Sequence, residues 1–232
     1  MKKLFLAYLV LFLTIPAFAQ QEGNLGSWYM YFGNYRFSDS PWAIHAELQH
    51  RNHNVLGDLD QLLIRTGLQY NLKSGQASFL AGYASITSGE LGESKKSFHE
   101  NRLYQEVLLR QKLGIIGLNH RYRFEQRWID GQNFRTRFRY SLSLNLPLNQ
   151  KELNQKGAFY LQVYDEIFIN LQKRPVAIQY FDRNRLYLGL GFRPSSKVAL
   201  QIGLMEQTTN IASRTQLQFG AYHQLFSKKN PT

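Results

Sequence analysis

The chain has 232 residues, a formal net charge of +12, a mean hydropathy of −0.38 and no cysteine. A helical membrane protein needs about 20 consecutive apolar residues per span, whereas the long apolar run Leu4–Ile15 is shorter and lies at the N-terminus. Without cysteine, disulfides, thiolate metal sites and a cysteine nucleophile are excluded. A hydrophobic content of 44%, with 14% aromatic residues, argues against intrinsic disorder. We therefore expect a folded chain that is not a helical membrane protein.

The N-terminus has the three parts of a secretory signal peptide. Two lysines precede the apolar run Leu4–Ile15, and Ala17-Phe18-Ala19 follows it as a small-x-small cleavage site. We expect residues 1–19 to be cleaved and residues 20–232 to form one exported domain. Export through a bacterial inner membrane makes nucleic acid an unexpected partner, so the positive charge needs another explanation.

The rest of the chain alternates with a period of two, which is typical of strands with one apolar and one polar face. Ile116–Trp128 is the clearest case, because arginines alternate there with Leu, Tyr and Phe. Its length of about 12 residues suits a tilted strand that crosses a bilayer. Eleven such segments follow one another: Leu25–Tyr35, Trp42–Arg51, Gln61–Leu72, Ala77–Ile86, Asn101–Lys112, Ile116–Trp128, Phe134–Leu146, Ala158–Asn170, Asp182–Phe192, Val198–Gln207 and Arg214–Phe226.

The connections between these segments alternate between short and long, as in outer-membrane barrels with short periplasmic turns. One exception is Pro147–Gly157, which has eleven residues where a short turn is expected. The pattern predicts an all-β fold, a transmembrane antiparallel up-and-down β-barrel of 10 to 12 strands. Bacterial single-chain barrels have even strand numbers. The odd segment count leaves three explanations: a missed strand, a break of Leu25–Tyr35 at Gly33-Asn34, or a segment outside the barrel.

Alternation alone does not say which face meets lipid, since a soluble lipocalin-like barrel would turn its arginines outward. Three observations favour an apolar outer face: its near lack of charge, more segments than an eight-stranded soluble barrel needs, and aromatic residues near segment ends. Asp165 lies on the apolar face, which predicts a β-bulge near Tyr164 or a position beyond the hydrocarbon band. The aromatic residues expected to form interfacial girdles are Trp28, Trp42, Trp128, Phe192 and Phe226.

An apolar outer face places the arginines of the polar phase in the lumen. Guanidinium groups stay charged when buried and pair with carboxylate or phosphate. Two hypotheses remain open: a structural Arg/Glu/Tyr ladder that fills a small barrel, or a porin-like lumen that binds or passes small anions. The predicted lumen arginines are Arg102, Arg110, Arg121, Arg123, Arg127, Arg135, Arg137, Arg139, Arg183 and Arg185, with Glu106, Glu125 and Glu166 as counter-charges.

Two other functional classes stay open. An outer-membrane lipase, acyltransferase or protease would need a rim site, and His50 and His53 beside Asp58 and Asp60 are the candidates for a catalytic or metal site. His120 and His223 fall on the lipid-facing phase instead. A passive subunit of an envelope complex is the third class. We expect no cofactor and no metal; the expected partners are outer-membrane lipid and small anions or lipopolysaccharide phosphate, with protein partners unassigned.

Several short motifs resemble those of the domain-of-unknown-function family 2490 (DUF2490). The distinctive pieces are Arg121–Arg127 and Arg135–Tyr140, with further matches at Gly26-Ser27-Trp28, Glu100–Gln105, Tyr164-Asp165-Glu166 and Asn184–Gly189. The resemblance covers most of the chain after residue 19 and implies an exported outer-membrane β-barrel of the kind found largely in Bacteroidota. The tail Ser227–Thr232 departs from the pattern, because such barrels usually end on their last aromatic residue. The resemblance supplies no established activity.

Overall fold

The computed structural model describes residues 20–21, 25–38, 40–92, 96–172 and 180–227. The predicted signal peptide 1–19 and the end of the tail, 228–232, lie outside the described residues. The described part of the chain contains no helix that is long and apolar enough to cross a membrane.

All eleven predicted segments are strands, close to their expected bounds. Their alternation of apolar and polar residues suits a sheet with two different faces. A two-residue strand β1, Gln20–Gln21, precedes them. The eleven are β2 (Gly26–Arg36), β3 (Trp42–Asn52), β4 (Leu59–Asn71), β5 (Ala77–Gly89), β6 (Ser97–Leu113), β7 (Ile116–Ile129), β8 (Arg135–Pro147), β9 (Phe159–Asn170), β10 (Phe181–Ser195), β11 (Val198–Thr208) and β12 (Ala212–Phe226).

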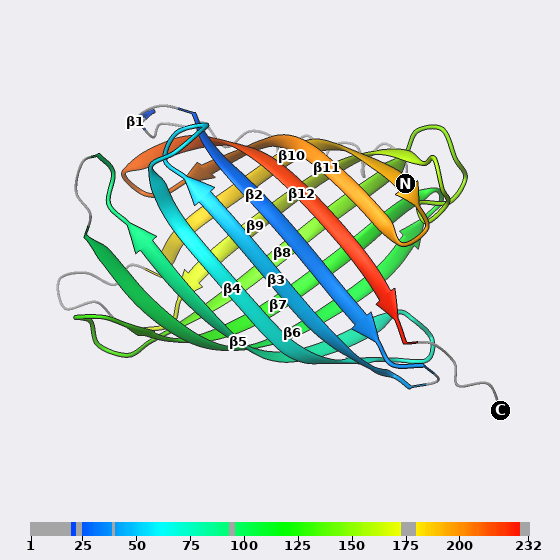
Figure 1. Ribbon diagram of the computed structural model, residues 1–232, viewed down its shortest axis with the longest axis horizontal. Coiled ribbons are helices and arrows are strands. Elements are labelled where there is room, and N and C mark those ends of the chain that lie inside the picture. The colour runs from blue at the N-terminus through cyan, green and yellow to red at the C-terminus, as the bar shows by residue number, and fades with distance from the viewer. Residues whose placement is uncertain (1–19, 22–24, 39, 93–95, 173–179, 228–232) are drawn as a thin grey trace, which may run out of the picture.

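Strands β2 to β12 form a closed barrel in which each strand pairs with the next along the chain. The barrel closes between β12 and β2, which pair in parallel over eleven residues from Gly26↔Gln216 to Arg36↔Phe226. Figure 1 shows this seam as the blue and red strands, whose arrowheads point the same way. With an odd number of alternating strands, the first and last must run in the same direction. The expectation of antiparallel pairing throughout is therefore wrong for this one pair, and Leu25–Tyr35 is not broken in two.

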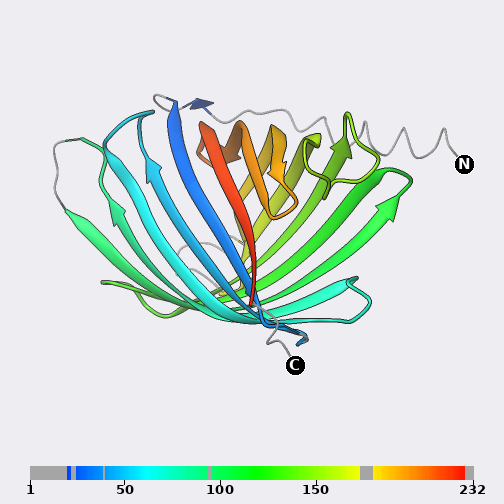
Figure 2. The ribbon, with the colours of Figure 1, turned by 45° about the vertical axis from the view of Figure 1, so that its right-hand side comes forward.

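The connections between strands lie at the two ends of the barrel, and the two ends differ in the length of their connections. The short-turn end carries the connections 37–41, 72–76, 114–115 and 196–197, together with the eleven-residue connection 148–158. The long-loop end carries the longer connections 53–58, 90–96 and 171–180, together with 130–134 and 209–211. Figure 2 shows the tilted strands running between these two ends around one interior space. Because the strand number is odd, β2 begins at the long-loop end, whereas β12 ends at the short-turn end.

The outer wall is largely apolar, and the inner wall carries the arginines. Middle positions of the strands expose Ile64, Leu68, Leu188 and Ile202 on the outside. Trp42 and Trp128 are also outside, 43% and 44% exposed, near opposite ends of the barrel. His120 and His223 lie on this wall too, hydrogen-bonded to Tyr140 and Tyr31.

Two expectations about the outer wall are corrected. Trp28 is not part of an aromatic girdle, because it shares the inner phase of β2 and is buried in the lumen beneath Arg51. Asp165 is on the outer wall, but the pairing of β9 with β8 and β10 runs past Tyr164 in regular register, so no bulge lies there. The carboxylate of Asp165 instead accepts two hydrogen bonds from Asn184 Nδ2, at 3.1 and 3.0 Å.

Candidate functional site

A layer of buried side chains crosses the lumen. We call it the closing layer and define it as Trp28, Arg51, Tyr104, Glu125, Arg137, Arg139, Phe168 and Arg185, from seven strands. None of these residues is more than 6% exposed. Guanidinium groups and aromatic rings lie next to one another in this layer. Favourable contacts between guanidinium groups and aromatic faces stabilise such an arrangement.

The aromatic part of the closing layer is held by stacked arginines. The guanidinium carbon of Arg51 lies 3.7 Å from the ring centre of Trp28, and that of Arg185 lies 4.7 Å from the same ring. Arg185 also contacts Phe168, at 4.6 Å, and Arg139 contacts it at 4.3 Å. These contacts link β3, β2, β10, β9 and β8 in one path through the lumen.

Glu125 is the centre of the charged part of the layer. Both Nε and Nη2 of Arg137 donate to its Oε2, at 3.0 and 2.6 Å. Arg139 Nη1 donates to Oε1 at 2.7 Å, and Arg102 Nη1 and Arg123 Nη1 lie 3.9 and 4.0 Å from that oxygen. Four guanidinium groups thus surround one carboxylate that is 1% exposed. Such a cluster is stable only while its central charge is in place.

Further ion pairs continue the network on both sides of the closing layer. Glu100 pairs with Arg127, with Nε to Oε1 at 2.6 Å, and Asp182 pairs with Arg137 at 2.8 Å. Glu106 pairs with Arg123 at 2.6 Å, and Arg139 shares Glu166 with Arg121, each at 2.7 Å. The six carboxylates in such pairs, Glu47, Glu100, Glu106, Glu125, Glu166 and Asp182, serve nine arginines.

The arginines therefore outnumber the carboxylates in the described lumen. Arg51 and Arg110 add to the excess, because their side chains donate to neutral groups. Arg51 Nη1 donates to Gln61 at 2.7 Å, and Arg110 Nη2 donates to Ser78 at 3.1 Å. A guanidinium group without a paired carboxylate has N–H donors whose geometry matches acceptors such as carboxylate or phosphate.

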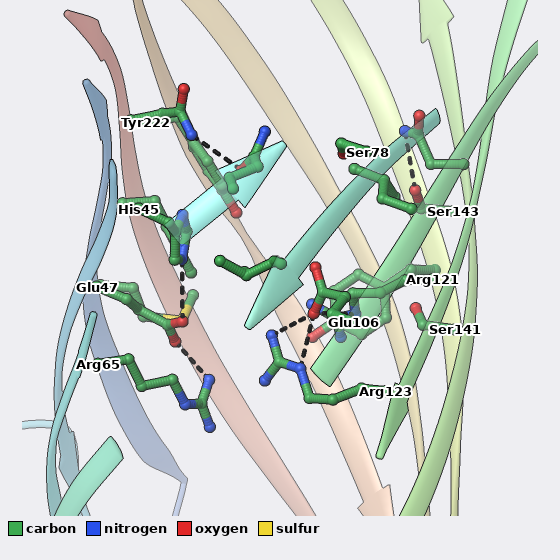
Figure 3. Close-up of a pocket in the computed structure, with 18 of the residues that line it drawn as sticks. His45, Glu47, Arg65, Ser78, Glu106, Arg121, Arg123, Ser141, Ser143 and Tyr222 are labelled. Carbon is green, nitrogen blue, oxygen red and sulfur yellow. Dashed lines mark hydrogen bonds and ion pairs between the residues drawn. The ribbon is translucent and has the colours of Figure 1, made fainter. Parts of the chain in front are cut away.

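A cavity of about 660 Å³ lies beside the closing layer. We call it the vestibule. Its lining includes Trp28, Arg139 and Arg185 of the closing layer and extends to Arg36 and Gly75 at the short-turn end. In Figure 3, Glu47 with His45 and Arg65 lies on one wall, and Arg121 and Arg123 with Glu106 lie across the space from it. The vestibule is therefore a cationic space next to the buried closing layer.

The structure places all ten predicted arginines on the inner phase of their strands, but in different surroundings. Arg110, Arg121, Arg123, Arg139 and Arg185 line the vestibule, as do Glu106 and Glu166. Arg102 and Arg137 contact Glu125 in the closing layer. The other three lie toward the long-loop end: Arg127 pairs with Glu100, Arg183 with Asp182, and Arg135 faces Arg127 in the β7–β8 register.

Four charged vestibule residues were missed in the sequence: Arg36, Arg51, Arg65 and Glu47. Arg65 Nη1 pairs with Glu47 Oε1 at 2.8 Å, and both side chains are buried. The signal was present, since Glu47 and Arg51 alternate with Leu48 and His50 as strictly as the arginines of β7 alternate with apolar residues. β3 and β4 each carry a single arginine, whereas β7 and β8 carry three each, so these charges were less conspicuous.

The histidines of the long-loop end do not come together. His53 Nε2 lies 3.9 Å from Asp60 Oδ1, whereas His50 is on the outer phase of β3. Asp58 Oδ2 accepts a hydrogen bond from the backbone of Gly92 instead. Among the described residues, no group of three or more His, Cys, Asp or Glu side chains could hold a metal ion.

Comparison with known proteins identifies the family. The profile of the family described as protein of unknown function (DUF2490) matches residues 25–218, which run from the residue before β2 into β12. An uncharacterized protein of Methylorubrum extorquens is 28% identical over 179 residues, covering 75% of this chain and 73% of the relative. No solved structure matches the chain. Because the profile spans the barrel strands and the arginine clusters, the chain belongs to the DUF2490 family.

Proposed function

We propose that this protein is a bacterial outer-membrane β-barrel whose vestibule binds small organic anions and whose closing layer prevents their free passage. The observation that carries the proposal is an excess of arginine over carboxylate around a cavity that borders the buried closing layer. Binding, and not conduction, is the function that this geometry favours.

The outer wall supports the membrane placement. Large apolar side chains are exposed along the middle of the strands, and monomeric soluble proteins rarely expose contiguous apolar surfaces of that extent. Trp42 and Trp128 lie where interfacial aromatic residues are expected in outer-membrane barrels. In the proposed orientation the short turns face the periplasm, so the vestibule opens toward the periplasm.

The closing layer supports binding over passage. A channel needs a continuous water-filled path, whereas Tyr104, Glu125 and Phe168 are each 1% exposed in the middle of the lumen. Moving the layer would separate several buried ion pairs at once, and each broken pair costs about 3 to 5 kcal/mol. An anion that enters the vestibule therefore reaches guanidinium groups of the closing layer that are held in fixed positions.

The charge distribution supports an anionic ligand. Arg36 and Arg110 lie near the short-turn ends of β2 and β6, and Arg121 lies two residues further into the barrel than Arg110 in the β6–β7 register. Arg121 is 31% exposed although it is paired with Glu166. An anion near these groups gains charge-assisted hydrogen bonds, which contribute about 1.5 to 3 kcal/mol each.

Calorimetric titration of the purified full-length barrel tests this proposal. Benzoate and phosphate should bind, and choline, as an organic cation, should not. Arg110→Gln should weaken anion binding about tenfold or more, because one charged donor is lost. Arg135→Gln is the matched control, since Arg135 is an inner-phase arginine outside the vestibule lining. Failure of every anion to bind, or equal binding of choline, would refute the proposal.

A further inference from the structure

The vestibule lining contains many neutral hydrogen-bonding side chains in addition to its arginines. Amide groups reach it from most parts of the barrel wall, and serine hydroxyls lie between them. Among them are Asn34, Gln69, Asn119, Ser143, Gln162 and Gln218. An inorganic anion needs only donors, and an alkyl chain needs neither donors nor acceptors, so neither ligand accounts for this composition.

Several of these amides are arranged in hydrogen-bonded ladders. Asn34 Nδ2 donates to Gln69 Oε1 at 3.0 Å, and Gln69 Nε2 donates to Asn71 Oδ1 at 2.6 Å. On the opposite side, Asn119 Nδ2 donates to Ser143 Oγ at 3.3 Å. An amide side chain offers two donors and an acceptor with two lone pairs. That combination matches a hydroxyl group, which both donates and accepts.

One buried amide has a donor that no described residue satisfies. Gln218 is 3% exposed and lines the vestibule. Its Oε1 accepts a hydrogen bond from Tyr164 Oη at 3.3 Å, but its Nε2 has no partner among the described residues. A buried donor without a partner costs about 1 to 3 kcal/mol, which an acceptor on a ligand would recover. The arrangement thus favours a ligand with neutral oxygen atoms as well as a charge.

Flat aromatic groups line the same space. Phe32 and Tyr222 stack with ring centres 4.6 Å apart, and both line the vestibule. Aromatic faces carry partial negative charge and attract the polarised C–H groups of a sugar ring. The cavity of about 660 Å³ is within the range for ligands of about 20 or more heavy atoms and is far larger than a phosphate ion.

We infer that the vestibule binds an acidic saccharide, with its charge on the arginines, its hydroxyl groups on the amide ladders and a ring face on the aromatic pair. The inference rests on the proposed anion-binding function and specifies its ligand class. The site assigns Arg110 and Arg121 to the acidic group and Gln162 and Asn119 to neighbouring hydroxyl groups. Sites built to bind hydroxyl groups discriminate strongly against ligands that lack them.

Titration with four probes tests the inference in a barrel that retains one tryptophan. The chain has three tryptophans, and Trp42→Phe with Trp128→Phe leaves Trp28, which lines the vestibule. The probes are digalacturonate, lactose, inorganic phosphate and octanoate. Digalacturonate should change Trp28 fluorescence with a Kd about tenfold or more below those of the other three, since it alone supplies both the charge and the hydroxyl groups.

The outcomes separate this inference from the proposed function. If phosphate or octanoate binds as tightly as digalacturonate, the saccharide inference is wrong and the anion-binding function stands. If lactose binds as tightly, or if no probe binds, both are wrong. Where a probe leaves the fluorescence of Trp28 unchanged, calorimetry measures its binding instead.

Two substitutions test the role of the amides. Gln162→Leu should weaken digalacturonate about fivefold or more and leave phosphate binding within about twofold, because only the saccharide uses the amide. Gln105→Leu is the matched control, since Gln105 is on the outer phase of β6. Equal loss of both ligands in Gln162→Leu, with the barrel still folded by circular dichroism, would contradict the assignment.

Discussion

Glu125→Gln tests whether the closing layer depends on its central charge. The substitution keeps the shape of the side chain, but it removes the negative charge shared by Arg102, Arg123, Arg137 and Arg139. It also turns an amide N–H toward guanidinium donors. With the amide nitrogen at the Oε2 position, Arg137 loses the two hydrogen bonds at 3.0 and 2.6 Å; with it at the Oε1 position, Arg139 loses the one at 2.7 Å. Breaking one side of a buried ion pair costs about 3 to 5 kcal/mol, and we expect the free energy of unfolding to fall by that amount.

Urea unfolding of the barrel in phospholipid vesicles, followed by tryptophan fluorescence, measures this loss. Glu152→Gln is the matched control, because its 2.7 Å pair with Lys112 is exposed and contributes less than about 1 kcal/mol. Adding Arg137→Gln to Glu125→Gln should recover part of the loss, since it removes one of the four positive charges that share this carboxylate. A cost below about 1 kcal/mol for Glu125→Gln would refute the view that this carboxylate organises the layer.

Three further experiments test the wall, the packing and the orientation. Leu188→Arg should lower stability in vesicles by about 2 to 4 kcal/mol, because Leu188 is 56% exposed at mid-strand on the outer wall; a cost below about 0.5 kcal/mol would place that wall in water. Gly203→Ala should cost about 1 to 3 kcal/mol in the same unfolding assay, since its Cβ would lie 2.4 Å from a backbone oxygen. Gly220→Ala should cost less, as its added Cβ meets a side chain at 3.0 Å. In intact cells, an impermeant maleimide should label Leu56→Cys in a long loop but not Lys73→Cys in a short turn, and the reverse labelling would invert the proposed orientation.

The strands and their inner faces were predictable from the sequence because a period of two fixes which side chains share a face. The alternation in Ile116–Trp128 placed Arg121, Arg123 and Glu125 on one side, and the structure has them there. The same rule would have found Arg51 and Arg65. Strand order also followed from the chain, since each strand pairs with the next.

Barrel closure and the depth of each side chain were not predictable in the same way. The parallel seam depends on the strand count, and the count conflicted with the even-number rule for bacterial barrels. Trp28 looked interfacial because it is near a strand end, but its phase directs it inward beneath Arg51. Tilt brings residues from different positions of seven strands to one level, so the closing layer has no signature in any single segment.

Fluorescence quenching by brominated phospholipids tests most directly whether the apolar wall meets lipid around a sealed interior. Three variants, each retaining one tryptophan, separate the positions of Trp28, Trp42 and Trp128. Trp42 and Trp128 are on the outer wall, whereas Trp28 is 4% exposed inside the lumen. We predict strong quenching of Trp42 and Trp128 and none of Trp28. Equal quenching of all three, or no quenching of the outer pair, would contradict a lipid-facing wall around an arginine-rich lumen.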